Sequence, residues 1–150
     1  MIKLLNKIFN RSNKKKDLVE NRPTELQISI TCLLVRAASI DDDFAILEEE
    51  KIEELVKKYF NLTGDDMVNV MKEAKVRESN AVDLYSFTKV IQKNLNQEER
   101  KIIIEMMWEI VAVDENFDPY ENNLVWRTAE LIGVSTRDRM NLKSKVIKNL

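Results

Sequence analysis

One pattern occurs twice in this chain, and it constrains the fold more than any other feature of the sequence. An apolar helical run ends in an acidic cluster, a Phe follows three residues after the first Asp of that cluster, and a Glu follows seven residues after it. The first copy covers residues 34–48 and begins its cluster at Asp41; the second covers residues 108–121 and begins its cluster at Asp114. Such a duplication predicts two related, pseudo-symmetric halves, each with an acidic turn between two helices.

Residues that interrupt helices are rare in this sequence. Two Gly and two Pro among 150 residues leave little material for the turns of a sheet. A chain of this length suits one domain that buries its apolar surface without disulfides. The sequence therefore predicts an all-α fold, a single-domain bundle of about seven helices. The helical spacing of apolar residues places them at residues 24–40, 48–60, 63–74, 83–95, 96–113, 118–132 and 135–150, with a polar turn at 75–80.

Several expected helices begin with a side chain that can cap the first turn. Thr24 and Ser135 are typical N-caps, and Asn96 with Glu99 forms the pattern of a capping box. The segment 118–121 combines an Asp N-cap, a Pro at the first helical position and a Glu at the third. These signals support the helical assignment independently of the apolar spacing.

The side chains that most enzymes use for chemistry are scarce. The chain has no His and one cysteine, Cys32, which lies in an apolar run and is expected to be buried. Most zinc, haem and His-based acid–base chemistry is thereby excluded, and the sequence has no Gly-rich phosphate loop. We therefore expect a binding or scaffold protein, not an enzyme. Trp108 and Trp126 lie at apolar helical positions and are expected in the core.

Charge is divided unevenly along the chain. Residues 1–16 hold six Lys or Arg and no acid, whereas residues 17–150 hold 18 bases and all 26 acids, a net charge of −8. We accordingly divide the chain into a basic amphipathic tail and linker, residues 1–22, and a helical domain, residues 23–150. Because the domain is acidic, we expect no specific nucleic-acid binding.

The tail alternates apolar and basic residues at helical spacing. Ile2, Leu5 and Phe9 can share one face, and residues 10–22 are polar and typical of a linker. Because lysines interrupt the apolar stretch, it is neither a secretory signal peptide nor a membrane span. One interpretation is an interfacial helix on an anionic membrane, and the other is a solubilising tail or a short helix packed on the domain. We expect a cytoplasmic protein, with peripheral contact between the tail and the inner membrane as the further hypothesis.

The two acidic turns offer oxygen ligands for a hard cation. The candidate ligands are Asp41, Asp43, Glu48, Asp114, Asn116, Asp118 and Glu121. A weakly bound Ca²⁺ or Mg²⁺ would offset the negative charge that such a cluster places at the C-terminal end of a helix. Residues 114–118 match the first three ligand positions of an EF-hand loop. However, Pro119 and Val125 stand where that loop needs Gly and Glu, so the turn is not an EF-hand.

Two other interpretations of the acidic turns stay open. In one, the acids only cap helices, and the protein is a purely structural interaction module. In the other, the paired carboxylates form a docking surface for a basic protein partner. A protein partner is expected on either interpretation, and the sequence leaves the oligomeric state open.

Several motifs together resemble the TerB-like family, which includes the tellurite-resistance protein TerB and the N-terminal domain of a membrane-anchored DnaJ-type co-chaperone. The motifs are the two Asp-x-x-Phe-x-x-x-Glu turns, residues 81–88, residues 98–100, residues 118–121 and residues 131–135. The resemblance covers about residues 24–148. It implies an all-helical bundle of two pseudo-symmetric halves, with acidic residues between helices as a proposed metal site. It also implies a link to tellurite or metal stress, in a branch of unknown function. The Gly that commonly follows the first Asp of each turn in the family is Asp42 and Glu115 here.

Overall fold

The computed structural model describes residues 24–39, 46–62, 64–81, 83–114, 117 and 119–150, and the regular secondary structure within them is helical. The helices are α2 (Glu25–Ser39), α3 (Ile46–Phe60), α4 (Gly64–Asn80), α5 (Tyr85–Asn94), α6 (Gln97–Val111), α7 (Pro119–Ile132) and α8 (Thr136–Lys148), with a short 3₁₀ turn η1 (Ala112–Asp114) after α6. This confirms the predicted all-α bundle of seven helices. The predicted tail and linker, residues 1–22, lie outside the described residues.

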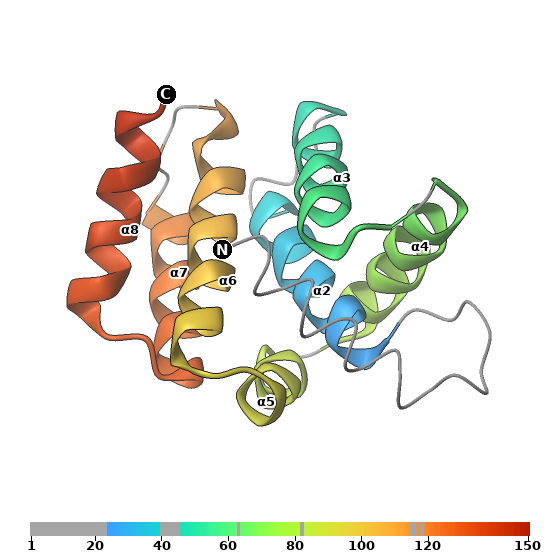
Figure 1. The fold of residues 1–150 in the computed structure, drawn as a ribbon, viewed down its shortest axis with the longest axis horizontal. Coiled ribbons are helices and arrows are strands. Elements are labelled where there is room, and N and C mark those ends of the chain that lie inside the picture. The colour runs from blue at the N-terminus through green and yellow to red at the C-terminus, as the bar shows by residue number, and fades with distance from the viewer. Residues whose placement is uncertain (1–23, 40–45, 63, 82, 115–116, 118) are drawn as a thin grey trace.

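The helices form two neighbouring groups around a shared core. Figure 1 shows α6, α7 and α8 standing side by side, α2, α3 and α4 forming the other group, and α5 lying between the two groups at one end. Helix α2 packs against α3, α4, α5, α6 and α7, and therefore joins the two groups. The order of helix, acidic sequence segment and two helices occurs before and after α5. The predicted pseudo-symmetry of the halves stays a prediction.

Helices α2 and α6 each contribute more residues to the core than any other helix, because they are apolar on nearly every side. In α2, Ile30, Leu33 and Leu34 have no exposed surface, and in α6 the same holds for Ile103 and Ile104. A helix that is apolar all round is stable only when other helices cover it, since each buried Leu or Ile gains about 1.5–3 kcal/mol from leaving water. The outer helices, such as α3 and α4, bury one stripe each and expose their charges.

Two predictions about these helices were wrong. Residues 75–80, predicted to form a polar turn, complete α4. Arg77 pairs with Glu25 at 2.7 Å, and Arg36 pairs with Glu78 at 3.1 Å, so contacts with α2 hold this polar segment in the helix. Trp126, predicted to lie in the core, is 43% exposed on α7.

Other predictions about the core were confirmed. Trp108 is 1% exposed, and its indole Nε1 donates a hydrogen bond to the Arg139 carbonyl oxygen at 3.1 Å. Cys32 is completely buried between α2 and α4, with its Sγ 3.5 Å from the Ala74 carbonyl oxygen. No helix in the described ranges is both long enough and apolar enough to cross a membrane.

Candidate functional site

The predicted cation ligands can be placed only in part. Asp41, Asp43, Asn116 and Asp118 lie outside the described residues, and Asp114 is the last residue of η1. Glu48 and Glu121 are described, and both are buried, with 6% and 3% of their surfaces exposed. Each is the third residue of its helix, Glu48 in α3 and Glu121 in α7. The two repeats therefore place a buried carboxylate at the same helical position directly after each acidic turn.

A third buried glutamate shows what this position does elsewhere in the protein. Glu99 is the third residue of α6 and is 2% exposed. Its Oε1 accepts a hydrogen bond from the Asn96 backbone N–H at 2.7 Å, and its own N–H donates to Asn96 Oδ1 at 3.0 Å. This reciprocal pair is the predicted capping box. Gln27, the third residue of α2, makes the same pair of bonds with Thr24. The third residues of α2 and α6 therefore both cap their helices, and the same role is consistent with the positions of Glu48 and Glu121.

The structure reveals a site that the sequence analysis missed, a cleft between α3, the end of α6 and the end of α8. Its volume is about 460 Å³. We call it the acidic cleft, and its lining residues are Glu50, Lys51, Glu54, Glu105, Glu109, Ala112, Val113, Val146, Asn149 and Leu150. The first lining residue along the chain, Glu50, comes two residues after Glu48, and another lining residue, Val113, directly precedes Asp114. The acidic cleft is therefore adjacent in sequence to both acidic turns.

The acidic cleft combines an excess of negative charge with apolar surface. Four carboxylates and one ammonium group line it, and the remaining surface comes mainly from Ala112, Val113, Val146 and Leu150. The Lys51 Nζ lies 3.7 Å from Glu54 Oε1, and the Nζ of Lys145, on α8, lies 3.0 Å from Glu105 Oε1. Even when Lys145 is counted, carboxylates outnumber ammonium groups by two. A ligand that complements this cleft carries positive charge beside apolar groups.

Glu109 is the most strongly perturbed carboxylate of the cleft. Its Oε2 is buried and has no hydrogen-bond partner among the described residues. Burial raises the pKa of Glu109, Lys51 and Lys58 oppose that rise, and the neighbouring carboxylates of Glu105 and Glu54 add to it. A carboxylate that is partly desolvated and lacks a hydrogen-bond donor gains more from an incoming cation than one in water does.

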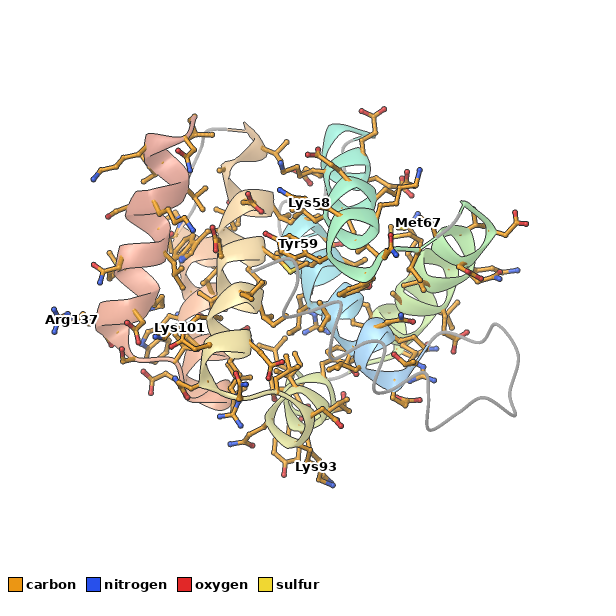
Figure 2. The ribbon with its side chains drawn as sticks, viewed as in Figure 1. Lys58, Tyr59, Met67, Lys93, Lys101 and Arg137 are labelled. Carbon is orange, nitrogen blue, oxygen red and sulfur yellow. The ribbon has the colours of Figure 1, made fainter. Side chains whose placement is uncertain are left out.

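Tyr59 lies near the same carboxylates. It is 6% exposed, and burial together with the carboxylates of Glu109 and Glu105 raises its pKa to about 12. The Lys58 ammonium group lies 5.6 Å from the centre of the Tyr59 ring. Figure 2 shows both side chains in the space between α3 and α6. Tyr59 is therefore a buried neighbour of the carboxylates of Glu105 and Glu109.

The carboxylates of the acidic cleft do not form a chelating site. Within the part of the chain that the structure describes, no group of three or more Asp, Glu, Cys or His side chains is placed to hold a metal ion. The four glutamates thus line the cleft as separate charges. The sequence does contain a signal for the two cleft glutamates of α6. Glu105 and Glu109 are four residues apart in the otherwise apolar run of α6, and therefore share one face of that helix.

Cys32 offers no nucleophile to any site. Burial raises its thiol pKa to about 12, so the thiolate that would react is absent at neutral pH. This agrees with the expectation that the cysteine is a core residue.

Comparison with known proteins identifies one family. The family described as "Tellurite resistance protein TerB" matches residues 27–144, well over half of the chain. No curated protein matches the chain, and no solved structure matches it.

Proposed function

The chain belongs to the TerB family, and we propose that it works there as a non-enzymatic binding module whose acidic cleft receives a basic, amphipathic segment of a protein. The observation that carries this proposal is the composition of the cleft, in which four carboxylates surround an apolar surface. The family description suggests tellurite or metal stress as the setting, and we place the module in the cytoplasm.

The chemistry of the cleft favours this class of ligand over the others. A basic amphipathic helix can insert apolar side chains against Val113, Val146 and Leu150 while its ammonium groups reach the glutamates. A nucleic acid would be repelled by the same carboxylates. Catalysis lacks support because the cysteine is buried and its thiol is protonated at neutral pH.

The test is a titration of the full chain with a synthetic amphipathic Leu/Lys peptide at low salt. Exposed ion pairs contribute about 0.2–1 kcal/mol each, so Glu54→Gln/Glu109→Gln should weaken binding roughly tenfold. Glu98→Gln/Glu130→Gln, which removes two charges outside the cleft, is the matched control and should bind like the parent. Equal binding by the two double variants would show that the peptide does not use the cleft.

A second candidate function is binding of a divalent cation at the acidic turns. The observation that favours it is the burial of Glu48 and Glu121 at equivalent positions after the two turns. The donor set is made only of oxygens, which fits Ca²⁺ or Mg²⁺, and its proposed members are Asp41, Asp43, Glu48, Asp114, Asn116, Asp118 and Glu121. Weak affinity is expected because neither turn has the glycine that an EF-hand loop uses.

Calorimetric titration of Ca²⁺ and Mg²⁺ separates this candidate from simple capping. A Gln at the third helical position still caps, so Glu48→Gln/Glu121→Gln keeps the caps and removes two ligand charges. If a cation binds, the parent should give saturable heat and a Tm that rises with cation concentration, and the variant should give neither. Absence of heat in the parent would leave these glutamates as caps.

A further inference from the structure

We infer that the occupant of the acidic cleft is the chain's own N-terminal segment, residues 1–16, which would cover the cleft until a partner displaces it. This inference rests on the proposed function, because it names the segment that the cleft binds. The basic tail would then bind the acidic domain of the same chain.

Charge complementarity is the first argument. Residues 1–16 carry six bases and no acid, whereas the cleft lining holds four carboxylates and one ammonium group. Oppositely charged groups near a protein surface attract one another, and the attraction is stronger at a partly buried group such as Glu109. An ammonium group beside Glu109 would also offset the charge of this partly desolvated carboxylate.

Apolar complementarity is the second argument. Ile2, Leu5 and Phe9 recur at helical spacing and can form one apolar face, with lysines between them. The cleft offers the apolar side chains of Val113, Val146 and Leu150 and a volume of about 460 Å³. That volume suits the insertion of a few side chains, with the backbone of the segment lying over the opening.

The third argument is that the linker is long enough for residues 1–16 to reach the acidic cleft. In Figure 1 the ends of α6 and α8 lie at the top of the view, whereas α2 begins near the bottom, so the distance to be spanned is of the order of the length of α2. The 15 residues of α2 make a helix of about 22 Å. Residues 10–22 form a linker of 13 residues, which can extend to roughly 43–47 Å. A tether of this kind gives an effective concentration in the millimolar range, so a contact with a Kd below about 1 mM would be formed in most molecules.

A spin label on the segment tests the inference in the full chain. A nitroxide attached at Ser12→Cys would label selectively, because Cys32 is buried and its thiol pKa is about 12. We expect amide NMR signals of Ala112, Val113, Val146 and Leu150 to lose at least half of their intensity. Glu54→Gln/Glu109→Gln should restore most of that intensity, and Glu98→Gln/Glu130→Gln should not. Uniform or absent broadening over the domain would overturn the inference.

A second arm distinguishes failure of this inference from failure of the proposed function. The six bases of residues 1–16 are replaced by Gln, and the synthetic Leu/Lys peptide is added to this variant. Peptide binding at the cleft, combined with no broadening in the first arm, would reject the tail as occupant and leave the proposed function standing. No binding in either arm would reject both.

Vesicles of phosphatidylglycerol test the competing destination of the tail. If the segment occupies the cleft, broadening should be present without lipid and should decrease as vesicles are added. The labelled protein could instead bind vesicles and show no broadening of the cleft signals without lipid. In that case residues 1–16 bind the membrane and not the cleft, and the inference is wrong.

Discussion

Glu109 carries a carboxylate into the space between α3 and α6, where solvent reaches it poorly. Its Oε2 has no hydrogen-bond donor among the described residues, and its pKa is raised by burial. Such a group destabilises the isolated domain when it is charged, and it favours any ligand that brings a positive charge. The same residue thus links the stability of the domain to its binding.

Replacement of Glu109 by Gln should stabilise the protein at neutral pH. An acid whose pKa is higher in the folded than in the unfolded state contributes most favourably at low pH, and that contribution is lost as the pH rises through the folded-state value. At pH 7 the expected gain for Glu109→Gln is about 1 kcal/mol, or about 2–4 °C in Tm. Urea unfolding from pH 4 to pH 7 measures it, with Glu130→Gln as control. A difference that grows toward acid pH would contradict the assignment.

The Asn96 cap should make a measurable contribution to stability. Its side chain accepts from the Glu99 N–H, and the Glu99 carboxylate accepts from the Asn96 N–H. Asn96→Ala removes the first of these bonds and should cost about 1 kcal/mol in the free energy of unfolding, as N-cap replacements do. Asn96→Asp keeps an acceptor and should cost much less. Equal losses for the two variants would argue against the cap.

The ends of helices differ in what they require of the backbone. Helix α7 ends at Ile132 and is followed by Gly133 at φ +79, and the N–H of Val134 donates to the Ala129 carbonyl oxygen at 2.8 Å. This is the left-handed ending for which glycine is preferred. Arg100 reinforces it, because its Nη1 donates to the Ile132 carbonyl oxygen at 3.1 Å.

Gly133→Ala and Gly64→Ala should have opposite effects. A Cβ at residue 133 would meet no tight contact but would strain the positive φ, at a cost of about 1 kcal/mol. Gly64 begins α4, and a Cβ there would meet nothing within 4 Å, so alanine should be neutral or stabilising by about 0.5 kcal/mol. Thermal unfolding of the pair measures both. Equal effects of the two substitutions would mean that the positive φ at residue 133 is not what makes Gly133→Ala costly.

The last turns of α4 depend on ion pairs with α2. Arg77 bonds both carboxylate oxygens of Glu25, at 2.9 and 2.7 Å, and also pairs with Glu73. Arg77→Met should change global stability by less than about 1 kcal/mol, because these groups are largely exposed. It should nevertheless speed hydrogen exchange at residues 76–80 several-fold, since that polar segment has few other anchors. Unchanged exchange there would mean that packing alone holds the segment.

The whole domain should unfold as one unit. Helix α2 packs against helices of both groups, and its Leu33 has no exposed surface. Leu33→Ala should therefore cost about 2–5 kcal/mol and lower a single calorimetric transition for the entire domain. Separation into two transitions would show that the groups around α2 and around α6 fold independently.

The sequence by itself determined the secondary structure and its start signals. Scarcity of Gly and Pro and the 3.6-residue apolar period depend on neighbours a few positions apart, so they predicted the all-α class, the number of helices and the caps at Thr24, Asn96 and Ser135. The resemblance to the TerB-like family also came from local motifs, and the family match confirmed it.

Tertiary structure decided what depended on distant neighbours. Residues 75–80 form a helix whose side chains pair with those of α2, and Trp126 lies at an apolar position of α7 that is 43% exposed. The acidic cleft joins α3, α6 and α8, although 36 residues separate the end of α3 from the start of α6. Local periodicity shows which face of one helix is charged, but it does not show which other faces meet it, because that depends on how the whole chain packs.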